Sequence, residues 1–442
     1  TWGTDFMNVG VRKLRIVPSQ VPAVTRDGCI DVFDLHGGSI QSYWTYNESS
    51  YTARIDVVGA NYWGKFNGWN EGVGSFRKGN FLIDLHSGAS LTYYCNNQRG
   101  SFNDEGVVVR TVGAGKLTLQ TRDVGSASGA LIVRNGACFD HDGELVFDTH
   151  SARIDGNNVI GPHLRKISAS SANGMFVRIN GTGVTLNVPD VNFYTTGTSV
   201  LVGNGTVNID CATAPHTFVA NSPETYTIPG NTMATANALT VSKTGAYEAM
   251  VTSKNLVKVW VREGVMRFMG ENCSVADLTA EEDAEAVVDG VALTLTADGK
   301  TLTHPAISTV NGGRIVYAGA GTAYLCEPRI TGSLCVTSGS LVPTAAAGEK
   351  RDGLSSVGPV EVQVGAGATL DLTAYTEISQ VIDGLTVSTA AANGTIKGGE
   401  LAAAGTIAVD AFDYENPPDP IELVFEDVAG LDRLGNWKVV CN

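Results

Sequence analysis

The sequence has few charged residues, few aromatic residues and none of the common metal or cofactor motifs. Charged residues make up 17% of its 442 residues and aromatic residues 7%, so a core has to be filled mainly by Val, Leu, Ile and Ala. No run of 18 apolar residues occurs, which excludes an ordinary transmembrane helix. The eight cysteines form no Cys-x-x-Cys pair, which argues against zinc-ribbon and thioredoxin-type chemistry.

Basic residues are scarce as well. The chain has 30 Lys and Arg against 45 Asp and Glu, a net charge of −15, and no Lys/Arg cluster. This charge opposes long-range attraction to nucleic acid and to anionic membranes. We therefore expect no nucleic-acid partner and no membrane insertion.

The start of the chain and its cysteines bear on location. The chain starts at Thr1 and not at Met, which is compatible with a removed signal peptide, so we expect an extracellular or cell-surface protein. The even number of cysteines permits disulfides there, with Cys326 and Cys335 as the closest pair, but buried free thiols fit equally well.

What the sequence does contain is repetition. An Asp-Leu-His phrase at residues 32–39 returns at 82–89, with a shorter copy at 146–151. A second phrase, glycine and threonine followed by alternating apolar and polar residues, occurs at 205–210 and again at 405–410. Such recurrence is typical of stacked repeat proteins.

These phrases predict strands and not helices. Apolar residues alternate with polar ones, and Gly, Asn, Asp and Ser clusters interrupt the chain every ~8–12 residues. A β-sandwich of this length would need linkers between domains, and none is visible. We therefore predict an all-β fold, a right-handed parallel β-helix (β-solenoid) with roughly 20–25 residues per coil, so that the repeat from 32–39 to 82–89 spans two coils.

Two departures from the repeat suggest a division of the chain. Residues 279–282 have the form of a capping box, and two Asp-Gly hairpin signals follow, which predicts a short helical and hairpin excursion near 274–303. The expected domains are an N-terminal β-solenoid at 1–272, with an aromatic-rich cap or interface region at 1–102, and C-terminal β-solenoid repeats at 273–442, with a closing module at 421–442.

The C-terminal third resembles a known class of proteins. The strings at 364–372, 382–385 and 393–401, with the terminal 423–437, are similar to the β-strand repeats of secreted bacterial proteins of the autotransporter-passenger type. The resemblance is confined to this third of the chain, and its motifs consist mostly of Gly, Thr and aliphatic residues. The resemblance implies a β-helical fold and an extracellular location more than an activity.

No catalytic motif is found. The strings that mark β-helical polysaccharide hydrolases and lyases are missing, as are Gly-x-Ser-x-Gly, His-Glu-x-x-His and Walker-type sequences. The repeated Asp-x-His places both side chains on one face of a strand, so each carboxylate could orient an imidazole, and stacking would align His36, His86 and, if the third copy follows, His150. Because catalytic sites rarely occur in triplicate, we interpret the phrase as structural.

A weak calcium candidate lies at residues 140–144. Asp140, Asp142 and Glu144 resemble the start of a calcium loop, but the glycine required sixth is Leu145 and the glutamate required twelfth is Ser151. The alternative is a solvated turn between strands. We expect no cofactor, with Ca²⁺ as the one candidate ion.

Aromatic residues gather near the N-terminus and supply the candidate binding residues. Trp44, Trp63, Phe66 and Trp69 could cap the open end of the solenoid, form a protein interface or stack on glycans. The closing module contributes Phe425 and Trp437.

The expected function is a secreted or surface-exposed structural or adhesive β-solenoid without catalysis. Its partner would be a second copy of itself, joined head to tail or laterally in a filament or surface layer, with glycans as a further partner. The alternative is a polysaccharide-active β-helix enzyme, a lyase or glycoside hydrolase, or a glycan-binding adhesin.

Overall fold

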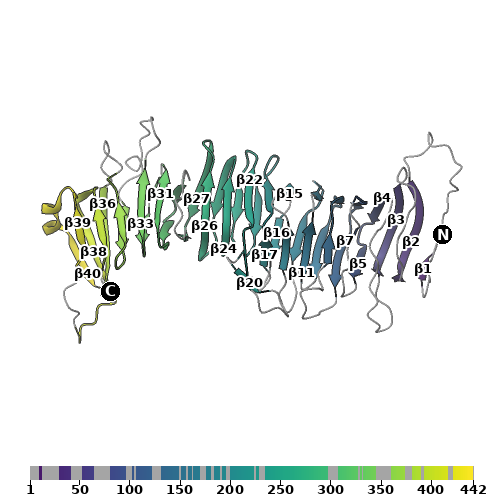
Figure 1. The fold of residues 1–442 in the computed structure, drawn as a ribbon, viewed down its shortest axis with the longest axis horizontal. Coiled ribbons are helices and arrows are strands. Elements are labelled where there is room, and N and C mark those ends of the chain that lie inside the picture. The colour runs from purple at the N-terminus through teal and green to yellow at the C-terminus, as the bar shows by residue number, and fades with distance from the viewer. Residues whose placement is uncertain are drawn as a thin grey trace. The chain divides into compact units, whose positions relative to one another are not determined.

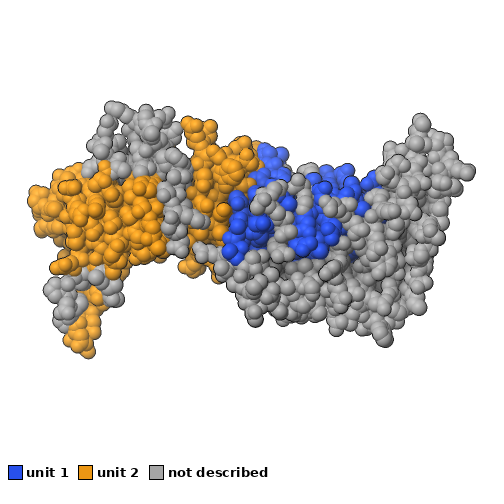
Figure 2. All heavy atoms as spheres, viewed as in Figure 1, with its two compact units in different colours: residues 1–241 blue, residues 242–442 orange. Residues whose placement is uncertain are grey.

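The computed structural model describes most of the chain as β-strands. The residues it describes are 9–11, 29–40, 52–63, 80–95, 102–103, 106–121, 131–148, 151–155, 158–161, 163–169, 176–180, 184–189, 192–195, 200–222, 225–227, 234–296, 307–326, 329–330, 332–344, 360–373, 381–389, 393–416 and 422–441. The chain divides into two compact units, Thr1–Val241 and Ser242–Asn442, which Figure 2 colours separately. Each unit is a stack of parallel strands (Figure 1).

Unit 1 contains three parallel ladders. The first joins β2 (Cys29–Ile40), β3 (Thr52–Trp63), β4 (Asn80–Leu85), β6 (Val108–Gly113), β9 (Ala137–Phe139), β12 (Asn158–Ile160), β15 (Thr185–Pro189) and β18 (Thr206–Asp210). The second runs from the end of β3 through β5 (Ser90–Cys95), β7 (Lys116–Thr121), β10 (Glu144–Asp148), β13 (Lys166–Ala169), β16 (Asn192–Thr195) and β19 (His216–Val219). The third joins β8 (Leu131–Val133), β11 (Ser151–Asp155), β14 (Phe176–Asn180) and β17 (Val200–Gly203).

Two antiparallel pairings complete unit 1. β1 (Val9–Val11) lies antiparallel to β2, and β20 (Thr225–Thr227) pairs with β21 (Ala234–Ala236). β22 (Thr240–Thr244) then crosses the boundary between the units.

Unit 2 repeats the pattern. Its first ladder contains β24 (Asn255–Val261), β26 (Cys273–Ala280), β28 (Ala292–Leu295), β30 (Arg314–Tyr317), β32 (Ser333–Val336), β34 (Val360–Val364), β36 (Val381–Ser388), β38 (Glu400–Asp410) and β40 (Lys438–Cys441). The second contains β23 (Ala249–Val251), β25 (Gly264–Phe268), β27 (Ala284–Asp289) and β29 (Ile307–Val310). The third contains β31 (Thr322–Cys326), β33 (Ser340–Thr344), β35 (Thr369–Asp371), β37 (Thr395–Lys397) and β39 (Val424–Glu426), and the 3₁₀ helix η3 (Leu431–Asn436) precedes β40.

The predicted parallel β-helix is confirmed. Strands one coil apart pair in parallel, with Thr52 of β3 opposite Asn80 of β4, and the same pattern continues through each ladder. Each strand alternates as its sequence indicates, so in β4 Phe81, Ile83 and Leu85 are buried while the residues between them face outward. Parallel crossovers are right-handed in nearly all proteins, which is the coil sense expected from the sequence.

The core holds aliphatic rows, as expected, and also aromatic side chains. In unit 1 the ring of Tyr93 meets Phe102 edge-on with centroids 5.2 Å apart, and Phe102 lies 5.7 Å from Phe139. Part of the aromatic enrichment of residues 1–102 is therefore core packing. Buried amides bind the coils together, because Asn158 Oδ1 accepts from the backbone N–H of Ala137, one coil earlier.

The helical part of the expected excursion is wrong. Residues 273–280 form β26, which pairs in parallel with β24 and β28, and residues 284–289 form β27. Alternating burial of Ala284, Ala286 and Val288 against neighbouring coils outweighs the local helix propensity. The Asp289-Gly290 signal forms a coil corner, with Gly290 at a φ of 67°, and the signal at 298–299 lies outside the described residues.

Three further features qualify the sequence expectations. Cys335 is a free, buried thiol, so the pairing with Cys326 is not formed. Within the described ranges, no helix has the length and apolar character needed to cross a membrane. The strand ladder continues across residues 272 and 273, where the sequence suggested a domain boundary.

Candidate functional site

The Asp-Leu-His repeat forms a column of aspartates on one side of unit 1. Asp34 of β2 is the strand partner of Asp56 in β3, and Asp56 is the partner of Asp84 in β4. Residues 34 and 84 therefore share one side of the solenoid, two coils apart, as predicted. Asp56 was not identified from the sequence, because its strand lacks the Leu-His that marks the other two. A search for Asp one coil after Asp34 could have indicated it, but the predicted spacing does not pair Asp56 with Asp84.

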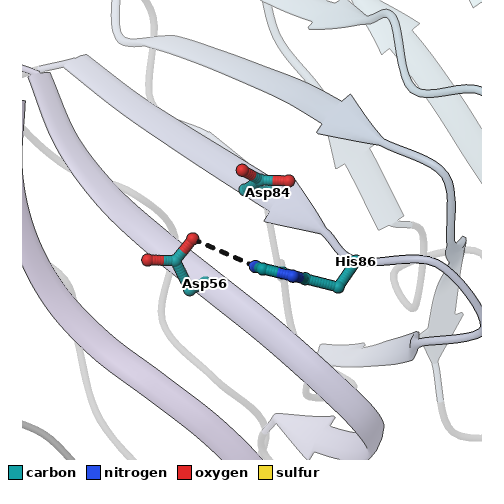
Figure 3. A group of neighbouring side chains, drawn as sticks. All are labelled: Asp56, Asp84 and His86. Carbon is teal, nitrogen blue, oxygen red and sulfur yellow. Dashed lines mark hydrogen bonds and ion pairs between the residues drawn. The ribbon is translucent and has the colours of Figure 1, made fainter.

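Asp56, Asp84 and His86 lie together on this column (Figure 3). Their ligand atoms all lie within 4.8 Å of one another. His86 Nε2 is 3.3 Å from Asp56 Oδ1, and the His86 side chain is 47% exposed. These three form the one such group of metal-ligating side chains among the residues that the structure describes.

Arg54 neutralises part of the charge on this group. Its Nε donates to Asp56 Oδ1 at 3.0 Å, and its Nη2 donates to Asp84 Oδ2 at 2.5 Å. Like charges directly opposite each other on neighbouring strands repel, and strands lie about 4.8 Å apart. Arg54 thus allows two aspartates to stack in adjacent coils.

A second Asp, His and Arg group follows on the same side. Asp140 comes directly after β9, and its backbone N–H donates to Thr111 O one coil earlier. Arg110 donates to Asp140 Oδ2 at 2.8 Å and His163 Nδ1 lies 2.8 Å from Oδ1. Burial raises the pKa of Asp140, but the hydrogen bonds from His163 and Arg110 outweigh it and the pKa is lowered.

His141 is the buried histidine of this region. Its Nδ1 lies 2.8 Å from Thr111 Oγ1 and its Nε2 lies 3.1 Å from Glu144 O. Burial lowers the pKa of His141 and outweighs the nearby Asp140 and Asp142, which raise it. Because Nε2 faces a carbonyl oxygen, it is the donor, and Nδ1 accepts from the threonine hydroxyl.

The three calcium candidates are engaged by cations from other coils. Asp140 binds Arg110 and His163, Asp142 binds Arg165, and Glu144 binds Lys116 and Lys166. Salt bridges and hydrogen bonds hold the pKa of each carboxyl below its ordinary value, against burial. A calcium ion at residues 140–144 would have to displace these cations.

The third Asp-x-His copy does not join the column. Asp148 belongs to β10, in the second ladder, where it is the partner of Gln120 and accepts a hydrogen bond from it at 2.8 Å. Asp148 therefore lies in another ladder than Asp34 and Asp84, so the aspartate of the third copy does not stack with those of the first two. His150 lies outside the described residues.

The structure describes only some of the predicted aromatic binding residues, and these differ in burial. Trp44, Phe66 and Trp69 lie outside the described residues, and of Trp63 the structure describes only its backbone, at the end of β3. Phe425 is half-buried in β39. Trp437 is only 7% exposed and its Nε1 donates to Ala402 O, so it packs within its own unit.

The two groups of aspartate and histidine side chains could bind a metal ion or orient an imidazole. Two carboxylates and an imidazole whose donor atoms converge are a ligand set for a divalent metal. A carboxylate that holds Nδ1 of a histidine, as Asp140 holds His163, orients the imidazole in the way that general bases and metal ligands require. Comparison with protein-family models, with curated proteins and with solved structures found no match.

Proposed function

We propose that this protein is a secreted structural β-solenoid that self-associates on a cell surface or in an extracellular filament. The observation that carries the proposal is the use of outward polar side chains as links between coils. Such pairs, each about one coil apart in sequence, are Arg54 and Asp84, Arg110 and Asp140, Gln120 and Asp148, Asn187 and Asn208, Arg267 and Asp289, and Lys397 and Glu426.

These links favour a scaffold over an enzyme. A catalytic group has to be available to a substrate, whereas these carboxylates, guanidinium groups and amides are bound to the neighbouring coil. Linked coils resist opening along the stack, which is what a surface protein under mechanical tension requires. The net charge of −15 supports proteins or glycans as partners more than nucleic acid or anionic membranes.

Exposed apolar side chains in the closing module support self-association. Val439 of β40 is 59% exposed, Val424 of β39 is 46% exposed and Leu431 is 43% exposed. Apolar side chains of this kind, meeting the aromatic segment at residues 63–69 of a second copy, would give a head-to-tail contact, which propagates unless it is capped.

Electron microscopy and light scattering test this proposal. The wild type should form filaments or layers, and the double variants Trp63→Ser/Trp69→Ser and Val424→Ser/Val439→Ser should each remain monomeric. Tyr414→Ser is the matched control, because Tyr414 is 75% exposed and lies outside both segments. A wild type that stays monomeric at high concentration would contradict self-association.

A separate assay tests the enzymatic alternative. We expect the purified protein to release no oligosaccharides from pectin, alginate or mucin glycans. Release that is lost in His163→Ala, where the imidazole held by Asp140 is removed, would replace the structural proposal with a catalytic one.

A further inference from the structure

The group of Asp56, Asp84 and His86 has an arrangement that coil-to-coil linkage alone does not require. Arg54 already joins the two carboxylates, yet a histidine from the turn after β4 also reaches Asp56 (Figure 3). We propose that Asp56, Asp84 and His86 bind a first-row divalent metal ion of the Zn²⁺ class, which links β3 to β4.

The donor distances fit such an ion. Ligand atoms at 2.0–2.2 Å from a tetrahedral ion lie about 3.3–3.6 Å from each other. His86 Nε2 and Asp56 Oδ1 are 3.3 Å apart, which matches one edge of that tetrahedron, and all three donors lie within 4.8 Å. For an ion to bind, the Asp84 carboxylate has to move toward the other two ligand atoms.

The ligand types select the class of metal. Imidazole with carboxylates suits Zn²⁺ and its first-row neighbours, whereas Ca²⁺ takes six to eight oxygen ligands. Three protein ligands leave the fourth position of a tetrahedral ion to water. The half-exposed His86 lets an ion reach the site from solvent.

Electrostatics supply a reason for the site. Asp34, Asp56 and Asp84 occupy successive positions of one column, so their backbone register brings three acidic residues together. Stacked like charges destabilise a sheet, and a divalent cation between two of them relieves that repulsion more than one guanidinium does.

Arg54 is the competitor of the metal. It donates to Asp56 Oδ1, the same oxygen that lies near His86, so the guanidinium has to move when an ion binds. The Arg54 side chain is 36% exposed and can turn into water. The metal and Arg54 therefore alternate at the same carboxylates, and removal of the guanidinium should strengthen metal binding.

Isothermal titration of the full chain with Zn²⁺ alone tests this inference. His86→Ala and Asp84→Asn should each weaken Zn²⁺ binding at least tenfold, and Arg54→Gln should strengthen it severalfold. His163→Ala is the matched control, because His163 also pairs with an aspartate and stands beside an arginine, but among the described residues it belongs to no group of three converging ligand atoms. It should leave Zn²⁺ affinity unchanged.

The Arg54 variant keeps the test decisive if a ligand variant folds poorly, since misfolding does not raise affinity at a specific site. A second readout is the melting temperature, which should rise with Zn²⁺ concentration in the wild type and in Arg54→Gln but not in His86→Ala. Equal Zn²⁺ affinity in His86→Ala and His163→Ala, or weaker binding by Arg54→Gln, would overturn the proposal.

Discussion

Unit 1 and unit 2 build the same kind of parallel ladder but fill their cores differently. Both units contain longer and shorter coils, since in unit 2 the strand partner of Asn255 is Ser274 whereas that of Ser333 is Glu361. Of the large side chains that are fully buried, unit 1 holds most of the aromatic ones, including Phe81, Tyr93 and Phe139. Within the described residues, aromatic rings therefore contribute more to the core of unit 1 than to that of unit 2.

The polar side chains of the two units differ as well. The histidines whose side chains are described, His86, His141, His163 and His216, all belong to unit 1. Unit 2 links its coils through groups such as Arg267, which binds Glu248 at 2.5 Å and Asp289 at 3.0 Å. We therefore expect the stability of the two units to respond differently to core truncation, to low pH and to the removal of charged side chains.

Truncation of a core ring should give the largest effect. Phe139→Ala removes a side chain that is 2% exposed and packs against Phe102, so we expect unit 1 to lose about 3–5 kcal/mol of unfolding free energy. Urea unfolding followed by near-ultraviolet circular dichroism measures it. Leu293→Ala in unit 2 should lower the stability of its own unit by about 2–5 kcal/mol, and loss of both units in either variant would show that they unfold as one.

Glycine at coil corners should matter equally in both units. A Cβ on Gly143 would overlap the carbonyl oxygen of Gly115, and a Cβ on Gly332 would overlap that of Gly313. Because neither corner has room for a methyl group, Gly143→Ala and Gly332→Ala should each cost about 1–3 kcal/mol of unfolding free energy.

The matched control for the corners is Gly435→Ala. No atom lies within 4 Å of a Cβ at Gly435, so its urea midpoint should stay at the wild-type value. A destabilised Gly435→Ala, or a neutral Gly143→Ala, would contradict the steric explanation.

Lowering the pH should reduce the stability of unit 1, through His141, and leave that of unit 2 unchanged. Its folded-state pKa lies below the ordinary 6.5, so the unfolded chain binds the proton more tightly. The stability of unit 1 should be complete above pH 6.5 and fall as the pH drops below it, and His141→Gln should lose that dependence. Urea midpoints between pH 7.5 and pH 5 measure it; a unit 2 that loses stability over the same range would contradict the assignment.

The fold could be predicted from the sequence, but only part of the candidate site could. The alternation of Leu370, Asp371 and Leu372 and the repeated Asp-Leu-His phrase were enough to predict strands, coils and the shared side of Asp34 and Asp84. The helical signal at 279–286 failed because burial of Ala284 and Val288 depends on the strands of neighbouring coils, such as β25, which lie outside the local window of sequence.

The site was hidden for a related reason. Coil length changes along unit 1, since Asp56 pairs with Asp84 in an early, longer coil and Leu186 pairs with Val207 in a later, shorter one. A fixed spacing therefore does not find Asp56 beside Asp84, nor His163 beside Asp140. The sequence shows the aspartate of each pair, but strand register decides which residue lies beside it. Register follows from how many residues each corner holds, which local sequence does not determine.

Removal of surface arginines should give the smallest effects. Arg267 bridges two carboxylates and is 27% exposed, so Arg267→Ala should cost up to about 1 kcal/mol in unit 2, less at high salt. Arg165 in unit 1 binds Asp142, and the two side chains are 66% and 51% exposed. Water and salt screen such a pair almost completely, so Arg165→Ala should leave the urea midpoint unchanged at physiological salt. A larger loss in Arg165→Ala than in Arg267→Ala would show that burial does not set the strength of these links, and that the corner around Asp142 is held by its arginine.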